Sequence, residues 1–533
     1  MTKSALFRTV GRILRQSLAN ESRSSSGLFA MNRREGLKSL GCGTLALYMN
    51  ACRTASESTL ENVQPSADVV VIIGAGAAGL SAAYYLKKAG IRSKVYEASD
   101  RLGGRIFTQY GFNKEKMFCE RGGELIDSGH KEIQSLMTEL NLELEKLPDP
   151  GLKPEVHFLE GRWRMEAELI KAFEALAKKI ASDAMGFMIN GEFTMPTYQN
   201  PISDAVKTLD MTSLKDYLDS TKEIAENWVR ELIRVAYVGE YGLEAEEQSA
   251  VNLVSFIGTE LSSGFKMFGE SDELFRIKGG NSKLISSLAK KLPKVAMNHE
   301  LKSIAKNSLG EFQLLFQVKG QIVEVKASRV ILSIPFTVLR GIEGIDRIGL
   351  SARKLLAIKE LGYGTNAKLM LGYSSRFWRE TGKSHPANDG NLLTDLRFQG
   401  GWDSSRQQKG LSGIFTNFMG GKWAETFPQS KVKSSMEDLE KVYPKISQKH
   451  DGNRVLQVWT AVPTAKGSYI CPKPGQYTTF AGCLSEPECE GTLFFAGEHT
   501  SEASAGFMNG AVESGMKAAA QYLEGNFQMR RGA

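Results

Sequence analysis

Three glycines in the run Gly74-Ala-Gly76-Ala-Ala-Gly79 have the spacing of a phosphate-binding turn. In such a turn the first glycine allows the tight bend, the second lets the backbone approach a pyrophosphate, and the third lets helix and strand pack closely. The helix that follows offers free N–H groups and a partial positive charge to phosphates. Glu97, 23 residues after Gly74, can accept hydrogen bonds from both hydroxyls of a ribose. These residues predict a dinucleotide site, and by themselves they fit either NAD or FAD.

Two further segments decide between these cofactors. Ala98-Ser-Asp-Arg101-Leu-Gly103-Gly104-Arg105 directly follows Glu97, and a second glycine-containing segment, residues 493–515, lies near the other end of the chain. They resemble the second glycine motif and the C-terminal flavin motif of the flavin-dependent amine oxidase family, which includes monoamine, polyamine and L-amino-acid oxidases. The resemblance covers about residues 68–525. It implies bound FAD, with Arg105 at the flavin's phosphates or ring edge and Glu498 at its ribityl chain.

The resemblance continues between these two motifs. Residues 120–130 resemble the segment that runs along the flavin toward the substrate, and Leu301 stands where a backbone amide faces adenine. The residues expected to bind the cofactor are Gly74, Ala75, Gly76, Ala77, Ala78, Gly79, Glu97, Ala98, Arg101, Gly103, Gly104, Arg105, Gly122, Gly123, Glu124, Leu301, Gly497, Glu498, Gly506, Phe507 and Met508.

Three residues are expected to carry the catalysis. Lys368 matches the family lysine that holds a water at flavin N5 and is tied to oxygen reactivity. A lysine in an apolar strand must be paired or lose its proton, unless it faces solvent from an edge strand. Tyr469 and Phe507 match the two aromatic walls that would sandwich the substrate, although either could be an ordinary core residue. Ser468 stands where some relatives have a cysteine bonded to the flavin, so non-covalent FAD is expected.

The reaction implied is oxidation of an amine to an imine. Water would hydrolyse the imine to an aldehyde or keto acid plus ammonia, and O2 would reoxidise the flavin to give hydrogen peroxide.

The substrate class is open between amines and amino acids. Amino-acid oxidases of the family clamp the substrate carboxylate with an arginine shortly after the segment around Gly122, and no arginine stands there. Arg397 or Arg406 could substitute for it. The acidic residues Glu124, Asp127 and Glu240 favour a primary amine or polyamine. Residues 237–254, in contrast, resemble the bacterial amino-acid oxidases and keep an L-amino acid as the alternative.

The sequence also indicates the elements that position these residues. Residues 68–73 form a continuous β-branched run, typical of a buried parallel strand. A helix over Leu80–Ala89, a strand over Ser93–Glu97 and a return strand over Val330–Pro335 are expected to follow. The predicted fold class is α/β: a two-domain, FAD-binding Rossmann-like fold of the glutathione-reductase type with an interleaved α+β substrate domain.

The two predicted domains are discontinuous in the chain. The FAD-binding domain would comprise residues 68–124, 271–344 and 466–525, and the substrate-binding domain residues 125–270 and 345–465. A leader over residues 1–52, a linker over 53–67 and a tail over 526–533 complete the expected organisation.

Composition excludes several classes of partner. The net charge is +7, but residues 1–60 hold nine Lys or Arg and three Glu, so the rest of the chain is nearly neutral and no nucleic-acid partner is expected. The six histidines have no paired spacing, so no metal site is predicted. No apolar run reaches the roughly 18 residues of a membrane-spanning helix. The expected partners are a small-molecule amine or amino acid and O2, with a homodimer left open.

The N-terminal segment has the layout of a secretory signal. Arg33 and Arg34 precede an apolar stretch that ends just before Cys52. The arginine pair resembles a twin-arginine signal, and residues 49–52 resemble a lipoprotein cleavage box whose cysteine would be acylated. We expect export to the periplasm, with a membrane contact only through a lipid anchor at Cys52. Translation from Met31 would put the arginines where a signal needs them; a mitochondrial presequence or a leader without function is the alternative.

Two other functions fit the same cofactor fold, namely an FAD-dependent C–C desaturase and a non-catalytic flavin-binding protein. Cys483 and Cys489 could form a disulfide in an oxidising compartment or remain two free thiols.

A fusion of residues 31–66 to a folded reporter tests the export hypothesis. We expect the reporter in the periplasmic fraction, because a twin-arginine route carries folded proteins. The same fusion with Arg33→Lys and Arg34→Lys should stay in the cytoplasm. Retention of the unaltered fusion in the cytoplasm would contradict the hypothesis.

Overall fold

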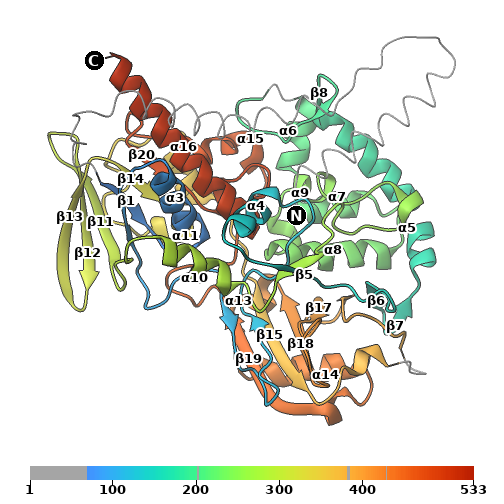
Figure 1. Cartoon of the computed structure of the whole chain (residues 1–533). Coiled ribbons are helices and arrows are strands. Elements are labelled where there is room, and N and C mark those ends of the chain that lie inside the picture. Colours follow the sequence, from blue (N-terminus) through green and yellow to red (C-terminus); the bar gives the residue numbers. More distant parts are fainter. Residues whose placement is uncertain (1–68, 201–202, 381–384, 428, 533) are drawn as a thin grey trace.

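The computed structural model describes residues 69–200, 203–380, 385–427 and 429–532 (Figure 1). The expected leader, the linker and Cys52 lie outside these residues, so the export and anchor hypotheses stay predictions. The described chain is a mixed α/β structure. No helix within it is both long and apolar enough to cross a bilayer.

A four-stranded parallel sheet lies at the centre of one half of the molecule. Its order is β2 (Ser93–Tyr96), β1 (Val70–Ile73), β14 (Val330–Leu332) and β20 (Leu493–Phe495), and all neighbours are parallel. In β1, Val70 and Ile72 join one hydrophobic cluster while Val71 and Ile73 join another. Both faces of the strand are therefore buried, which explains its uninterrupted apolar sequence.

Each face of this sheet is covered by a different layer. One hydrophobic cluster joins the sheet to the helices α3 (Ala77–Lys88), α4 (Lys131–Glu139), α10 (Ser282–Lys291) and α16 (Met508–Gly532). The other joins it to the antiparallel strands β11 (Glu300–Lys306), β12 (Phe312–Val318) and β13 (Gln321–Ala327), seen at the left of Figure 1.

The other half contains a seven-stranded sheet. Its order is β19 (His450–Val458), β15 (Ala367–Tyr373), β18 (Gly413–Met419), β17 (Gly400–Asp403), β16 (Leu392–Thr394), β6 (Val156–Leu159) and β7 (Arg162–Arg164). Only β16 and β6 run parallel within it. The helices α13 (Gly421–Glu425) and α14 (Lys431–Val442) pack against this sheet.

A helical cluster completes this half, seen at the right of Figure 1. It comprises α5 (Glu166–Ala184), α6 (Asp204–Met211), α7 (Leu214–Ser220), α8 (Asn227–Tyr241) and α9 (Ala250–Val254), which share one hydrophobic core. The apolar residues of α5 recur at helical spacing and face this core, as the sequence predicts.

Short elements connect these layers. They are β3 (Thr108–Gln109), β4 (Cys119–Glu120), β5 (Leu144–Lys146), β8 (Met188–Ile189), β9 (Glu192–Phe193), β10 (Phe275–Ile277), α11 (Phe336–Leu339), α12 (Ala352–Glu360) and α15 (Gln476–Phe480). The 3-10 helices are η2 (Met185–Phe187), η3 (Ala245–Glu247), η4 (Leu261–Ser263), η5 (Phe377–Arg379), η6 (Ile446–Lys449), η7 (Cys483–Ser485) and η8 (Glu498–Thr500).

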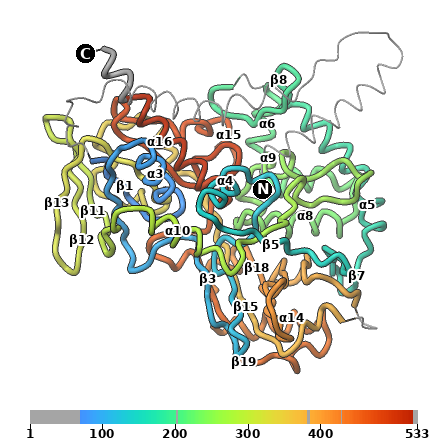
Figure 2. Tube along the Cα trace, viewed as in Figure 1, coloured from blue at the N-terminus to red at the C-terminus, as the bar shows by residue number. Residues whose placement is uncertain are grey.

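The half with the parallel sheet is assembled from separated parts of the chain. Figure 2 shows blue, yellow and red segments side by side there, and mainly green and orange segments in the other half. Strand pairing agrees, because β1 lies between β2 and β14, and β14 pairs with β20. The domain bounds expected from the sequence stay a prediction.

Two local features refine the sequence-based expectations. The helix after the glycine turn begins at Ala77 rather than Leu80, because Gly76 serves as its N-cap and the small residues that follow fit the first turn. Cys483 and Cys489 are buried free thiols, so of the two alternatives the structure has no disulfide.

Gly79 is expected to tolerate no side chain. A Cβ at this position would overlap the carbonyl oxygen of Gly74 and the hydroxyl of Ser333. Gly79→Ala should therefore lower the free energy of unfolding by about 1–3 kcal/mol through overpacking. Gly525→Ala in α16 is the matched control: no atom lies within 4 Å of its added Cβ, so a gain of about 0.5–1 kcal/mol is expected. Urea unfolding measures both changes, and equal stabilities would contradict the close packing.

Candidate functional site

A cavity of about 560 Å³ extends between the parallel sheet and the other half of the molecule. Its walls come from the β1–α3 turn, the end of β2, the segments 103–106 and 122–125, the start of β11, and the residues after β14 and β20. On the opposite side, α8, β15, β17, β18 and residues 459–472 line it. Segments far apart in the sequence thus share one cavity.

The start of α3 faces this cavity as a site for an anion. Its N-cap is Gly76, with no side-chain cap and no acidic residue in the first turn, so the first N–H groups of the helix have no acidic or capping side chain in front of them. A Cβ added to Gly76 would meet nothing closer than the carbonyl oxygen of Gly103 at 4.0 Å. Open space and unpaired donors together suit a phosphate group.

Glu97 lies next to this turn with its carboxylate held in place. Its Oε2 accepts a hydrogen bond from the amide of Ala75 at 2.8 Å. Its Oε1 accepts from the amide and the hydroxyl of Ser99 at 2.9 and 2.7 Å. The side chain is buried and lines the cavity. Oε1 already accepts two hydrogen bonds and Oε2 only one, so Oε2 keeps a lone pair for a ribose hydroxyl.

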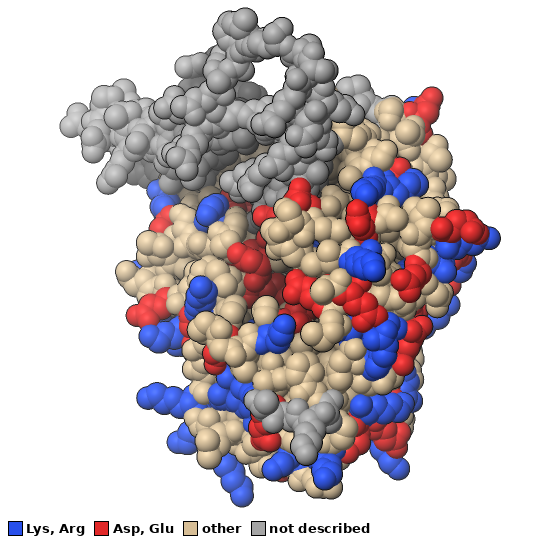
Figure 3. All heavy atoms as spheres, turned by 90° about the vertical axis from the view of Figure 1, so that its right-hand side faces the viewer, with Lys and Arg blue, Asp and Glu red and all other residues tan. Residues whose placement is uncertain are grey.

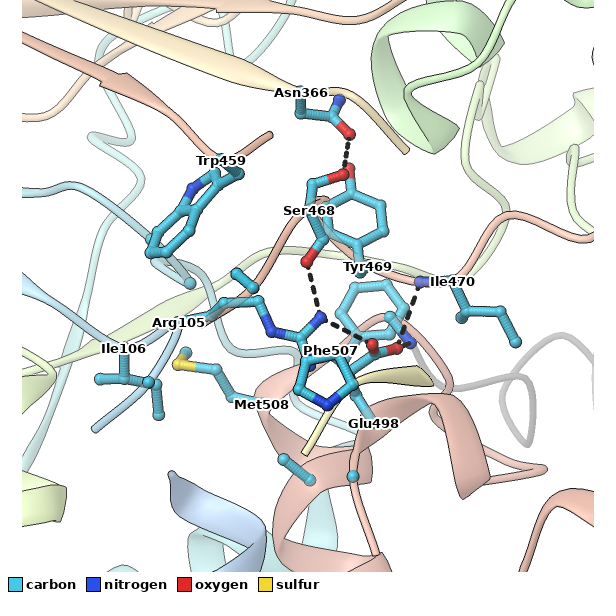
Figure 4. A pocket seen from close by; sticks show the side chains of 18 of the residues that line it. Arg105, Ile106, Asn366, Trp459, Ser468, Tyr469, Ile470, Glu498, Phe507 and Met508 are labelled. Atoms are coloured by element: carbon cyan, nitrogen blue, oxygen red, sulfur yellow. Dashed lines mark hydrogen bonds and ion pairs between the residues drawn. The ribbon is translucent and has the colours of Figure 1, made fainter. Parts of the chain in front are cut away.

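An ion pair joins three segments at the next part of the wall. The guanidinium of Arg105 donates from Nη1 to Glu498 Oε1 at 2.8 Å and to the carbonyl of Ser468 at 2.6 Å (Figure 4). Glu498 Oε2 accepts from the amide of Gly506 at 2.9 Å. The hydroxyl of Ser468 donates to Asn366 at 2.6 Å. The segments that carry Tyr469 and Phe507 are therefore fixed to one carboxylate.

Lys368 lies in the interior of the larger sheet. Its strand β15 is buried along its whole length between β18 and β19, so the edge-strand alternative is wrong. Its Nζ donates to the carbonyls of Gly122 at 2.8 Å and Glu120 at 3.3 Å, and to Glu124 Oε2 at 3.0 Å. All three N–H groups thus have protein acceptors, and a bridging water of the expected kind would have to replace one of them.

Two half-buried carboxylates, Glu240 and Glu273, also line the cavity. Burial raises the pKa of Glu240 to about 7. Burial and the nearby Glu240 and Asp127 carboxylates raise the pKa of Glu273 to about 8. Within the described part of the chain, neither side chain makes a hydrogen bond or ion pair. They form an acidic wall that gains its negative charge as the pH rises through about 7 and 8.

The two predicted aromatic walls lie next to these acids. The Tyr469 hydroxyl donates to the backbone carbonyl of Glu240. The centroid of the Phe507 ring lies 5.2 Å from that of the His130 ring. The backbone amide of His130 donates to the carbonyl of Asp127, whose side chain accepts from the amide of Glu273 at 3.0 Å. Both aromatic residues line the cavity. Their expected role in holding a substrate stays a prediction.

Arg397 and Arg406, either of which could substitute for the carboxylate clamp, do not line the cavity. Arg397 pairs with Asp438 at 2.6 Å, and Arg406 lies 3.5 Å from Asp389. Each thus forms an ion pair with an aspartate, and Asp389 is shared with Arg379. Arg105 is the only arginine among the described residues that line the cavity.

All residues expected to bind the cofactor line the cavity except Ala75, Gly79 and Arg101. Ala75 acts through its amide, which holds Glu97. Gly79 packs against the glycine turn. The guanidinium of Arg101 donates to the carbonyl of Gly104 at 2.6 Å and lies over the ring of Phe107. These three residues can support the site, but they do not form its surface.

Several lining residues had no signal in the sequence. They are Glu273 and the aromatic side chains Phe256, Phe268, Trp402 and Phe418. None belongs to a short motif, and the tertiary fold alone brings them to the cavity. Among the described residues, no group of three or more His, Cys, Asp and Glu is placed to hold a metal ion.

Comparisons with known proteins agree on one family. The family model "flavin containing amine oxidoreductase" matches residues 77–523. The chain is 24% identical to a putative L-amino-acid oxidase, YobN, of Bacillus subtilis, over 84% of this chain and 93% of that protein. It is 26% identical to an L-amino-acid oxidase of Vipera ammodytes ammodytes, over 84% and 91% respectively.

Solved structures share the fold. A putrescine oxidase mutant superposes with a TM-score of 0.72 at 20% identity, covering 86% of this chain and 99% of that one. A cyclohexylamine oxidase from Brevibacterium oxydans gives a TM-score of 0.70 at 23% identity, with the same coverage.

Replacing Glu273 should change how stability depends on pH. The pKa of Glu273, about 8 when folded, lies above that of an unfolded glutamate, about 4.3, so the folded state binds the proton more tightly. Its contribution is present at acidic pH and is lost as pH rises to about 8. Glu273→Gln should therefore lose less stability, by on the order of 1–2 kcal/mol, between about pH 5 and 8. Urea unfolding between pH 5 and 8 measures this difference, and Glu324→Gln, at an exposed position, is the control. If the free energy of unfolding of Glu273→Gln fell with pH as steeply as that of the wild type, the raised pKa of Glu273 would be contradicted.

Proposed function

Because the chain belongs to the flavin containing amine oxidoreductase family, we propose that it oxidises the C–N bond of an amine to an imine with non-covalently bound FAD. Water then hydrolyses the imine to an aldehyde or keto acid and ammonia, and O2 accepts the electrons to give hydrogen peroxide. A bound flavin would supply the hydride acceptor. The residues of this chain bind, orient and shield the reactants.

The residues of the cavity fit FAD. The uncapped start of α3 and the open space at Gly76 suit the pyrophosphate, and the fixed carboxylate of Glu97 suits a ribose. These features support a Rossmann-like cofactor domain around the parallel sheet and a second domain that covers the substrate.

Non-covalent binding is supported by the position of the thiols. The described cysteines, Cys119, Cys471, Cys483 and Cys489, are buried, and none lines the cavity. Ser468, where some relatives carry the bonded cysteine, cannot form a thioether, and its hydroxyl is engaged with Asn366.

The observation that carries the substrate class is the charge of the cavity wall. Glu240 and Glu273 form no ion pair with a described residue, although the charge of Arg406 acts on Glu273, and Arg105 is already paired with Glu498. A carboxylate-bearing substrate would meet repulsion and no free arginine, but an ammonium group would find acceptors. On the face beside α5, acidic side chains also gather around a hollow (Figure 3), which favours approach of a cation. A primary amine or polyamine fits this wall.

The same residues can handle the proton of the substrate. An amine enters mainly as its ammonium ion, which must lose a proton before its C–H bond can be oxidised. Glu240, whose pKa is raised to about 7, is partly ionised at neutral pH and can accept that proton, whereas Glu273, with a pKa of about 8, can do so only at higher pH. Tyr469 and Phe507 would then hold the neutral amine between their rings.

An L-amino acid is the second candidate, and the curated relatives favour it. The proteins matched at 24 and 26% identity are named as L-amino-acid oxidases. A substrate carboxylate could still bind through backbone donors, although no lining arginine is free for it.

Export belongs to the proposal as well, and its support is the sequence of residues 31–52 alone. A lipid anchor at Cys52 would hold the enzyme at the periplasmic face of a membrane. A homodimer is compatible with every part of the proposal.

Anaerobic mixing of the purified yellow holoprotein with a pool of amines, and separately with a pool of L-amino acids, tests the function. Bleaching by the amines is expected. Bleaching by the amino acids alone would overturn the substrate class. No bleaching by either pool would favour a C–C desaturase or a non-catalytic flavin protein, and a colourless protein would contradict the cofactor. In the Glu240→Gln, Glu273→Gln double variant, we expect KM for a diamine to rise about ten-fold or more relative to a monoamine.

A further inference from the structure

Glu124 is a buried carboxylate whose two oxygens have different partners. Oε2 accepts from Lys368 Nζ at 3.0 Å, and Oε1 accepts from the hydroxyl of Ser404 at 2.9 Å. Its residue is 5% exposed, and both Glu124 and Lys368 line the cofactor cavity. This ion pair joins the segment 122–125 to β15, in the interior of the seven-stranded sheet.

Contacts of Ser404 hold the carboxylate in place. The guanidinium of Arg276 is almost fully buried and donates to the carbonyl of Ser404 at 3.0 Å and to Glu145 at 2.7 Å. Ser404 thus holds Glu124 and is itself held by Arg276. Burial alone would raise the pKa of Glu124, but the charges of Lys368 and Arg276 and the two hydrogen bonds hold it below its ordinary value. Glu124 is therefore anionic at neutral pH.

Among the described residues, no other carboxylate is bonded to the ammonium of Lys368. Its remaining acceptors are the backbone carbonyls of Gly122 and Glu120. The side chain of Glu120 is turned to Asn281 and Thr108, and burial raises its pKa to about 7. Of the other titratable groups here, Cys119 is a buried thiol. Arg121 donates to Gln457. The charge of Lys368 thus depends on Glu124.

We propose that Glu124 is a positioning residue that keeps Lys368 protonated and fixed at the wall of the cofactor cavity. A buried ammonium without a counter-ion loses its proton readily. The ionised carboxylate of Glu124 supplies that counter-ion at 3.0 Å. A fixed positive charge there would favour the step in which O2 takes up electrons. This inference rests on the proposed function only for that last consequence, since the ion pair itself needs no substrate.

The main test uses holoprotein reduced with dithionite, so that no amine turnover is required. Reoxidation by O2 should be nearly independent of pH in the wild type. In Glu124→Gln the reoxidation rate should fall about ten-fold or more between pH 6 and pH 9, as the ammonium is lost. Lys368→Met, and the double variant Glu124→Gln, Lys368→Met, should be slow at every pH. A profile of Glu124→Gln that is flat with pH would overturn the proposal.

A second measurement on the flavin-free protein covers the case in which Glu124→Gln binds no FAD. An unpaired buried lysine binds its proton less tightly in the folded than in the unfolded state, so stability should rise with pH from about 6 to 9 in Glu124→Gln. The double variant Glu124→Gln, Lys368→Met should show no rise of stability with pH. Both variants contain Glu120, so its titration does not contribute to the difference between their slopes. Identical slopes would overturn the proposal.

Asp438→Asn is the matched control, because Asp438 is an equally buried carboxylate that pairs with Arg397 and lies outside the cavity. It should lower stability without introducing a pH-dependent reoxidation. Glu124→Asp should restore part of the wild-type profile. Failure of every amine and amino acid to bleach the flavin would count against the proposed function and leave these two readouts unaffected.

Discussion

The carboxylate of Glu498 is the contact on which the geometry of the cavity depends. It binds the guanidinium of Arg105 and the amide of Gly506, and Arg105 in turn binds the carbonyl of Ser468. The positions of the neighbouring Tyr469 and Phe507 follow from these bonds, because each aromatic residue is adjacent in the chain to one of the residues they hold. A buried charge-assisted network of this kind orders several loops with few groups.

The parts of the site that use local backbone geometry were predictable. A phosphate-binding turn needs glycines at fixed spacing and a helix start directly after them, so residues 74–79 and Glu97 could be recognised from order and spacing alone. The parallel strand β1 could be recognised because burial on both faces leaves only apolar residues. No comparable local pattern predicted that the antiparallel strands β11, β12 and β13 cover one face of the parallel sheet.

The parts that depend on partners distant in the sequence were not predictable. Arg397 and Arg406 looked available for a substrate carboxylate, and their neutralisation by Asp438 and Asp389 is visible only once the chain is folded. Glu273 could not be predicted either, because an acidic residue before a short strand is common in sequences. Only the fold shows that it lines the cavity and that its side chain forms no ion pair with a described residue.

The strand order of the parallel sheet also has a consequence for biosynthesis. The sheet of β1 is not complete until β20 has been made, and α3 acquires its neighbour α16 only after residues 508–532 have been made. Such long-range closure delays folding. Glu498 emerges from the ribosome at the same late stage. The cavity therefore forms only after the residues of β20 and the start of α16 have been synthesised, and a shorter nascent chain lacks part of its wall.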